Sequence, residues 1–325
     1  MKERKERHQR FPPVERVPVV ILGGADSKKE AEYEKKIVRR SYKEHSLAGE
    51  YKGLIEINEK PIVQIVIDAF KSSEYVKDVY LIGPEKLYQN KVKNCNIIDN
   101  STVIEIKNRS QHGSFAYNIL KAIEAVKTDS KSGYNGKVVI SACDLPLLSH
   151  SSVDDIISEF LFESDIRGAD LCHPLVCAEA FEQYEHFRDR PALKLRGKEG
   201  DERYRLGNIA YMRPEKMQRI FGILQNTRKA RKAEDWIVYL RLIGLVFAKV
   251  NLSAPYYIAK YYMGRLSIDD INKAASKAFD AEIRLIESDD AAIGIDIDSE
   301  EDLMYVRKII KPKNVIKMDS HRDKK

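Results

Sequence analysis

The chain has 325 residues, enough for one large α/β domain with an insertion, or for two small domains, with a sizeable core. A net charge of +6 suggests nucleic-acid binding until the charges are located. The first ten residues carry a net +3 and the last fifteen a net +4, which leaves the body near −1. We therefore predict solvated, mobile basic tails at 1–16 and 311–325, a single domain over 17–310, and no nucleic-acid partner.

The apolar segments are too short or too interrupted to enter a membrane. None approaches the roughly 20 apolar residues of a membrane span, and the charged start is not followed by a typical secretory signal. The stretch WIVYLRLIGLVFAKVNLSAPYYIAKYY is apolar enough to suggest membrane contact, but Arg241, Lys249 and Pro255 break it up, so a buried helical pair or a homodimer face is the favoured interpretation. The four cysteines include no CxxC pair, and CHPLVC lacks the second pair typical of a zinc site. These features favour a cytoplasmic protein with reduced thiols.

Short apolar runs alternate with helical patterns, which indicates βα units around a mostly parallel sheet. Four runs dense in Val and Ile are predicted as buried strands: VPVVILGG, VKDVYLIGP, GKVVISACD and AAIGIDID. Helices are predicted in PIVQIVIDAFKSS, SFAYNILKAIEAV and SSVDDIISEFLFES. Ser151 with Asp154, and Ser299 near Glu301 and Asp302, are the predicted N-terminal caps. The expected fold is an open, mostly parallel, Rossmann-like α/β sheet flanked by helices.

A different pattern runs from about 180 to 290, where an Arg- and Tyr-rich stretch precedes helices with many aromatic residues. We predict that this segment is a helical, aromatic-rich insertion that covers the sheet edge and shapes a substrate site. Its basic residues Lys194, Arg196, Arg203 and Arg205 could bind an anionic phosphate. A solvated basic face is the alternative.

Glycines and carboxylates end three of the predicted strands. Gly23 and Gly24 end the first, Asp144 the third, and Asp296 and Asp298 the last. Open parallel sheets bind ligands beyond the carboxyl ends of their strands, so these residues are expected at one edge.

The double glycine and a nearby lysine suggest contacts with phosphate. Glycines after a strand let main-chain N–H groups approach a phosphate, although LGGADSK matches neither GxGxxG nor a P-loop and could be a plain turn. Lys52 precedes an apolar segment and could neutralise triphosphate charge; taken alone, it is more simply a solvated lysine.

The aspartates suggest a metal ion. An unpaired carboxylate at the end of a buried strand is costly, and two carboxylates that converge with phosphates suit Mg²⁺. Asp144 and Asp298, with Asp296 as a further candidate, are the predicted ligands. Helix capping is the alternative, and the position of Asp298 just before SEEDLMYV fits it well.

Four motifs in order give the chain a family resemblance: LGG, a lysine followed by NEKPIVQIVIDAF, then SACDLPLLSH, and finally IDIDSEEDL. They resemble the nucleotidyltransferases of the molybdenum-cofactor guanylyltransferase-like and sugar-phosphate type, which have the nucleotide-diphospho-sugar transferase fold. The resemblance covers roughly 17–310. It implies that Gly23 and Gly24 cradle nucleotide phosphates, that Lys52 pairs with them, and that Gly113 and Ser114 lie against the base.

The same resemblance extends to the metal and the acceptor. It implies that Asp144 and Asp298 bind magnesium, with Asp296 less certain, and that Asn208 borders the acceptor site. The glycine loop is short of the usual glycine and alanine residues, and an insert at 25–50 separates it from the lysine. Within that insert, either Arg39 or Arg40 could replace the arginine that the family carries.

The expected activity is therefore transfer of a nucleotidyl group from a nucleoside triphosphate to a phosphorylated small molecule, with release of pyrophosphate. Lys52, Asp144 and Asp298 are the expected catalytic residues, and no general base is needed because the acceptor phosphate is already an oxyanion. One alternative is a glycosyltransferase of related fold, although SACDLPLL lacks the usual D-x-D. The other is a non-catalytic nucleotide-binding regulatory protein.

Overall fold

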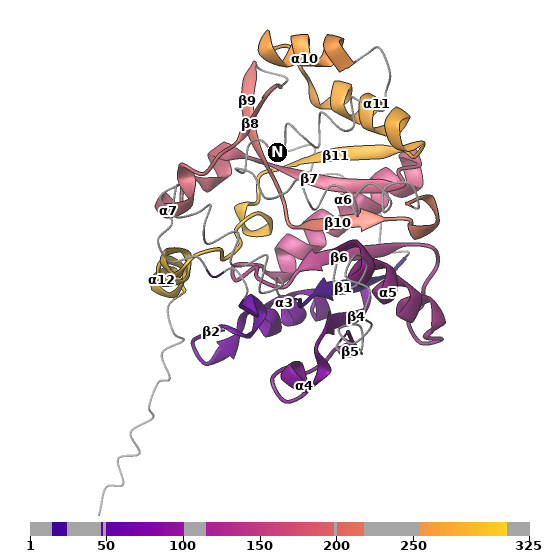
Figure 1. Ribbon diagram of the computed structural model, residues 1–325, viewed down its shortest axis with the longest axis vertical. Coiled ribbons are helices and arrows are strands. Elements are labelled where there is room, and N and C mark those ends of the chain that lie inside the picture. The colour runs from indigo at the N-terminus through magenta and orange to yellow at the C-terminus, as the bar shows by residue number, and fades with distance from the viewer. Residues whose placement is uncertain are drawn as a thin grey trace, which may run out of the picture.

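A nine-stranded sheet is the frame of the molecule (Figure 1). The computed structural model describes residues 15–24, 47, 50–100, 115–197, 200–217 and 254–310. The strand order is β5-β4-β1-β6-β10-β7-β9-β8, and β11 pairs with the other side of β7. The strands of this sheet are β1 Val17–Leu22, β4 Val76–Gly83, β5 Asn96–Asp99, β6 Val138–Ala142, β7 Leu171–Cys177, β8 Leu193–Arg196, β9 Asp201–Leu206, β10 Ile209–Met212 and β11 Ile283–Ser288. A separate ribbon pairs β2 Glu56–Ile57 with β3 Lys60–Pro61.

The sheet is mixed, with both parallel and antiparallel strand pairs. β5, β4, β1 and β6 are parallel neighbours, as are β7 and β11, whereas β10 runs antiparallel between β6 and β7. Leu22 of β1 pairs with Ala142 of β6, so these two strands end at the same level. The open α/β fold is confirmed, and the first and third predicted strands lie side by side in its centre.

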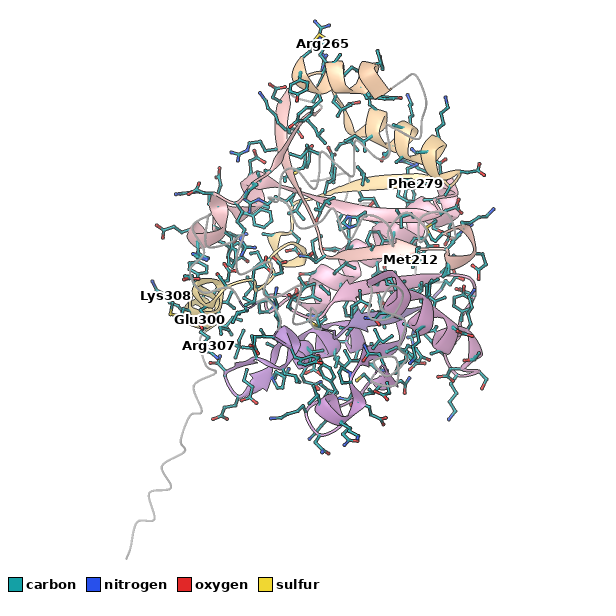
Figure 2. The ribbon with its side chains drawn as sticks, viewed as in Figure 1. Met212, Arg265, Phe279, Glu300, Arg307 and Lys308 are labelled. Atoms are coloured by element: carbon teal, nitrogen blue, oxygen red, sulfur yellow. The ribbon has the colours of Figure 1, made fainter. Side chains whose placement is uncertain are left out.

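Helices cover both faces of the sheet. The helices and 3₁₀ turns are η1 Lys52–Leu54, α3 Ile62–Lys71, α4 Glu85–Tyr88, α5 Phe115–Thr128, α6 His150–Arg167, η3 Ala178–Phe181, α7 Glu185–Arg188, η4 Pro214–Lys216, α10 Ala254–Tyr262, α11 Ile268–Phe279, η5 Ala291–Ile293 and α12 Glu300–Ile309. One core cluster joins the sheet to α3, α6 and α12, and a second joins the opposite face to α5 and α11. Met212 of β10 and Phe279 of α11 belong to the second cluster (Figure 2).

The segment predicted as the last strand, AAIGIDID, is not a strand. Asp290 accepts a hydrogen bond from the Ala292 N–H, which starts the short turn η5, and irregular chain continues to α12. Ile293, Ile295 and Ile297 are nevertheless fully buried, which explains the strand-like alternation. The strand in this region is β11, which precedes the turn.

The predicted insertion is partly woven into the sheet. Helices α10 and α11 fall within 180–290, but β10 and β11 come from the same range and pair with central strands. α10 lies at the upper extremity of the molecule in Figure 1. Much of the aromatic stretch lies outside the described residues, as do the basic tails apart from Glu15 and Arg16.

One predicted helix cap is confirmed and the other is wrong. Ser299 and Asp302 form a reciprocal capping box at α12. At α6 the cap is Ser149, whose side chain accepts from the Ser152 N–H, and Ser151 is already inside the helix. Two serines within reach of the same helix start made this choice ambiguous in the sequence.

Tyr88 of α4 explains two of the glycines at the strand ends. Its hydroxyl donates to the Gly23 carbonyl at 2.6 Å, and its ring occupies the space beside Gly23 and Gly83. A Cβ on Gly83 would lie 2.6 Å from Cε2 of Tyr88, and one on Gly23 would lie 2.8 Å from Leu81. By contrast, a Cβ on Gly24 would meet its nearest neighbour, Asn118, at an ordinary 3.6 Å. Packing therefore requires Gly23 and Gly83 independently of any ligand.

We predict that Gly83→Ala lowers the free energy of unfolding by about 1–3 kcal/mol, because the added methyl group overpacks the Tyr88 ring. Gly24→Ala is the matched control and should change stability by under about 0.5 kcal/mol. Urea denaturation measures both. Equal effects of the two substitutions would contradict this packing account.

Candidate active site

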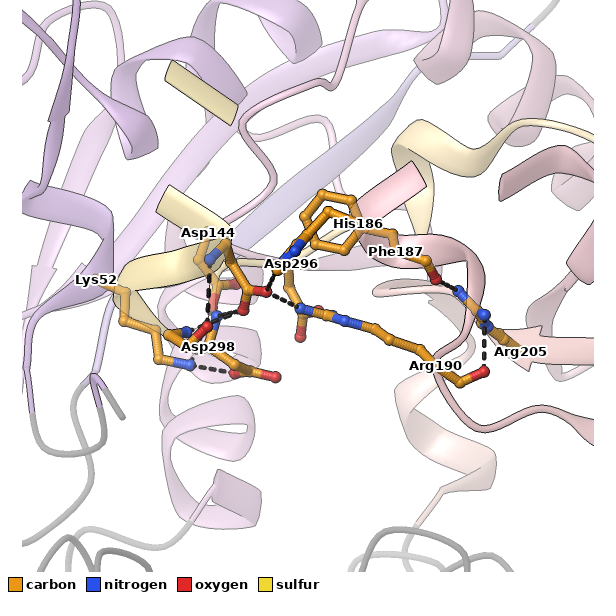
Figure 3. Close-up of polar contacts among 10 residues, drawn as sticks. Lys52, Asp144, His186, Phe187, Arg190, Arg205, Asp296 and Asp298 are labelled. Carbon is orange, nitrogen blue, oxygen red and sulfur yellow. Dashed lines mark hydrogen bonds and ion pairs between the residues drawn. The ribbon is translucent and has the colours of Figure 1, made fainter. Parts of the chain in front are cut away.

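Three aspartates converge beyond the end of β6. Asp144 follows this strand, and Asp296 and Asp298 lie in the chain between η5 and α12. Each offers a carboxylate oxygen within 4.8 Å of the others. Lys52 Nζ lies 2.5 Å from Asp298 Oδ1 and 3.6 Å from Asp144 Oδ2 (Figure 3). The structure thus brings together the lysine and the three carboxylates that the sequence singled out.

Main-chain contacts hold the segments that carry these residues. The Ala142 N–H donates to the Asn208 carbonyl at 3.0 Å, and the Asn208 N–H donates to the Ile293 carbonyl at 2.7 Å. Asn208 therefore joins the end of β6 to the turn that leads to Asp296. Its acceptor role stays a prediction.

Close packing also aligns Lys52 with Asp144. A Cβ on Gly53 would lie 3.1 Å from Sγ of the buried Cys143, so the glycine lets η1 press against the residue before Asp144. The Leu47 N–H donates to the Asp298 carbonyl at 3.0 Å, which brings the chain ahead of η1 to the same place.

Burial and the charges of neighbouring groups shift the pKa values of the residues in the cluster. Burial raises the pKa of Asp144, with Lys52 opposing and Asp298 adding to the rise. Burial, then the charges of Asp298 and Asp144, raise the pKa of Asp296 to about 7 against the opposing effect of Arg190. Burial disfavours the Lys52 ammonium, but Asp298, Asp144 and Asp296 together hold its pKa above the usual value. The site has an excess of negative charge, which suits a cation.

An arginine and a histidine that the sequence did not single out complete the cluster. Arg190 Nη1 lies 3.0 Å from Asp296 Oδ1, and its Nη2 lies 2.7 Å from Asp302 Oδ1. His186 Nε2 lies 2.8 Å from the same Asp302 oxygen. Both residues come from α7 or the chain just after it, where nothing in EHFRDRP indicates proximity to the aspartates.

Asp302 connects these side chains to the start of α12. Its Oδ2 accepts from the N–H groups of Asp298 and Ser299, both at 2.9 Å, and its side chain is only 2% exposed. A single buried carboxylate therefore caps the helix, fixes the main chain at Asp298 and pairs with Arg190.

Arg205, which was predicted to bind the acceptor, contacts the main chain of the protein itself. Arg205 is 7% exposed, and its guanidinium donates to the carbonyls of Phe187, Arg188 and Arg190 at 2.6–2.7 Å. Its guanidinium also stacks at 4.2 Å over the ring of Phe181. These contacts direct the cationic group at the loop after α7 (Figure 3), so Arg205 holds the segment that carries Arg190.

The other predicted residues stand apart from these contacts. Lys194 is exposed and pairs with Asp201 at 2.7 Å across β8 and β9. Arg196 and Arg203 are exposed on the same strands. Four predicted residues lie outside the described part of the chain: Arg39, Arg40, Gly113 and Ser114. Among the residues that are described, no helix is long and apolar enough to cross a membrane.

Comparison with known proteins shows which families and structures the chain is similar to. Residues 46–203 match the family model of the MobA-like NTP transferase domain. The chain is similar to the structure of a hypothetical transferase from Thermus thermophilus, with 19% identity and a TM-score of 0.57 over 89% of this chain and 99% of that one. It is also similar to a CMP:2-keto-3-deoxy-manno-octonic acid synthetase complexed with CTP, with 15% identity and a TM-score of 0.47 over 90% and 97%. No curated protein matches the chain.

The family match confirms the resemblance to MobA-like nucleotidyltransferases, and the likeness to the Thermus thermophilus protein supports the fold. Lys52 and Asp144 lie inside the matched segment, whereas Asp296 and Asp298 follow it.

We predict that Asp296→Asn stabilises the metal-free protein at pH 8 by ~2–3 kcal/mol, and much less at pH 4.5. A carboxyl whose pKa is raised on folding costs stability once it ionises; this cost grows from its unfolded pKa near 4 and is complete above about 7. Thermal unfolding across this pH range measures the effect, with exposed Asp189→Asn as the control. A gain that does not depend on pH would contradict the charge argument.

We predict that Arg205→Ala lowers the free energy of unfolding by ~3 kcal/mol, because three carbonyl contacts are lost. Arg203→Ala, on the same strand but exposed, should change it by under about 0.5 kcal/mol. Chemical denaturation compares the two. Unchanged stability in Arg205→Ala, with loss of activity alone, would restore the acceptor role.

Proposed function

We propose that this nucleotidyltransferase, whose residues 46–203 match the MobA-like NTP transferase domain, transfers a nucleotidyl group from a nucleoside triphosphate to a phosphorylated small molecule, with release of pyrophosphate. The acceptor belongs to the sugar-phosphate or alditol-phosphate class. The observation that carries the proposal is the convergence of Lys52 with Asp144 and Asp298 at the end of a central strand.

The donor set at this place fits a hard divalent cation, and we propose Mg²⁺. Three carboxylates with mutually close oxygens, two of them with raised pKa values, favour a cation that prefers oxygen ligands. Asp144 and Asp298 would hold it. When bound, the ion would neutralise charge on the reacting phosphates.

The reaction needs positioning and charge stabilisation more than covalent participation by the protein. An oxygen of the acceptor phosphate attacks the α-phosphorus, a new phosphorus–oxygen bond forms, and the bond to the bridging oxygen breaks as pyrophosphate leaves. We assign Lys52 the role of balancing the negative charge of the triphosphate. Its ammonium remains protonated through the pH range of the reaction, because the three nearby carboxylates raise its pKa.

Other parts of the proposal follow from the sequence. Gly23 and Gly24 would contact the phosphates, and the open space beside Gly24 makes it the better candidate for close approach. Gly113 and Ser114 would face the base. Lys194 and Asn208 would take part in acceptor binding. A homodimer and a cytoplasmic location also stay predictions.

We predict that Asp144→Asn lowers turnover at least ~100-fold, because the substitution removes a charged metal ligand at the reacting phosphates. The measurement is pyrophosphate release from each of the four common nucleoside triphosphates, against a panel of sugar and alditol phosphates with Mg²⁺. Asp78→Asn, in β4 and paired with Lys71, is the control and should keep full activity. Undiminished turnover in Asp144→Asn would exclude the proposed role of this carboxylate.

A further inference from the structure

Two cations face the aspartates, and the protein holds them in different ways. Lys52 reaches Asp298 and Asp144 through one flexible side chain. Arg190 reaches Asp296 from the opposite side and is anchored by its surroundings (Figure 3). A flexible ammonium can move to a phosphate when substrate arrives, whereas an anchored planar guanidinium keeps its partner.

Four contacts fix Arg190. Its second nitrogen pairs with the buried Asp302, and its guanidinium lies 4.5 Å from the ring centroid of Phe187. Its carbonyl accepts from Arg205, as do the carbonyls of Phe187 and Arg188. The fourth contact is the ion pair with Asp296 itself. Three of these restraints come from β9, α12 and Phe187 of α7, so they do not depend on the state of Asp296.

We propose that Arg190 is a positioning residue that keeps Asp296 as its ion-pair partner, so that a divalent metal is held by Asp144 and Asp298 alone. This inference rests on the proposed function and adds a division of labour among the three carboxylates. Asp296 serves as the counter-charge of a fixed arginine, and Arg190 sets how many carboxylates the metal can reach.

The chemistry of phosphate transfer favours such a division. Mg²⁺ in phosphate-transfer sites is held by one or two carboxylates and keeps its other positions for water and substrate phosphates. A third carboxylate in the coordination shell would tighten metal binding but would fill a position needed by the triphosphate. Arg190 prevents this by holding one Asp296 oxygen and by placing a positive charge beside that carboxylate.

Mn²⁺ binding without nucleotide tests the inference and needs no turnover. Free Mn²⁺ is measured by electron paramagnetic resonance at pH 8, with the wild-type chain, Asp298→Asn, Asp296→Asn, Arg190→Met and the double variant Arg190→Met/Asp296→Asn. We expect Asp298→Asn to weaken affinity at least ~10-fold and Asp296→Asn to change it by under about 3-fold. Arg190→Met should tighten binding ~10-fold, which a merely structural loss would not do.

The double variant separates coordination from simple charge. If Arg190→Met acts by releasing Asp296, its gain disappears when Asp296 is an asparagine. A gain that persists in the Asp296→Asn background would overturn the inference, as would an Asp296→Asn variant that binds Mn²⁺ as weakly as Asp298→Asn. Arg188→Met removes a charge from the end of α7, where Arg188 pairs with the exposed Asp189, and should leave affinity unchanged.

The outcomes also distinguish this inference from the proposed function. No measurable Mn²⁺ binding by the wild-type chain, or equal binding by Asp144→Asn and Asp298→Asn, would remove the metal site and with it both proposals. Normal binding with a strong Asp296 requirement would remove only the role of Arg190. If Arg190→Met does not fold, Arg190→Lys keeps the positive charge but lacks the two-pronged guanidinium. The comparison of Mn²⁺ affinity between Asp296→Asn and Asp298→Asn then still tests the inference.

Discussion

Three carboxylates have oxygen atoms within 4.8 Å of one another at one end of the sheet, and the rest of the site is arranged around this concentration of negative charge. Burial of like charges is costly, which is expressed in the raised pKa values of Asp144 and Asp296. Among the described residues, Lys52 and Arg190 offset part of that cost from opposite sides. The remaining excess is what makes the place suitable for a metal ion and phosphates.

The supports of this site are shared with the fold. Asp302 caps α12, binds the main chain at Asp298 and pairs with Arg190, so the position of one helix start and the position of two charged groups are linked. Arg205 holds the loop after α7 from β9. The cluster therefore depends on residues far apart in the chain, and its geometry is preorganised by buried polar contacts.

The local signals of the sequence were sufficient for the centre of the sheet and for part of the site. Val- and Ile-rich runs correctly indicated β1, β4 and β6. The expectation that residues at strand ends meet at one edge of the sheet correctly placed Asp144 near Asp298, even though AAIGIDID is not a strand. Arg190 could not be found this way, because its place depends on tertiary contacts made by Arg205 and Asp302. The burial of Arg205 has the same cause, since a basic stretch reads as solvent-exposed until its carbonyl partners are known.

The measurement that tests the central claim most directly is thermal stabilisation by each nucleoside triphosphate, with and without Mg²⁺, in the wild-type chain and in Asp144→Asn. A ligand that binds only the folded state raises the unfolding temperature. The account predicts a shift for at least one nucleotide that requires Mg²⁺ and is lost in Asp144→Asn. A nucleotide shift that is the same without Mg²⁺ and in the variant, or no shift with any nucleotide, would contradict it.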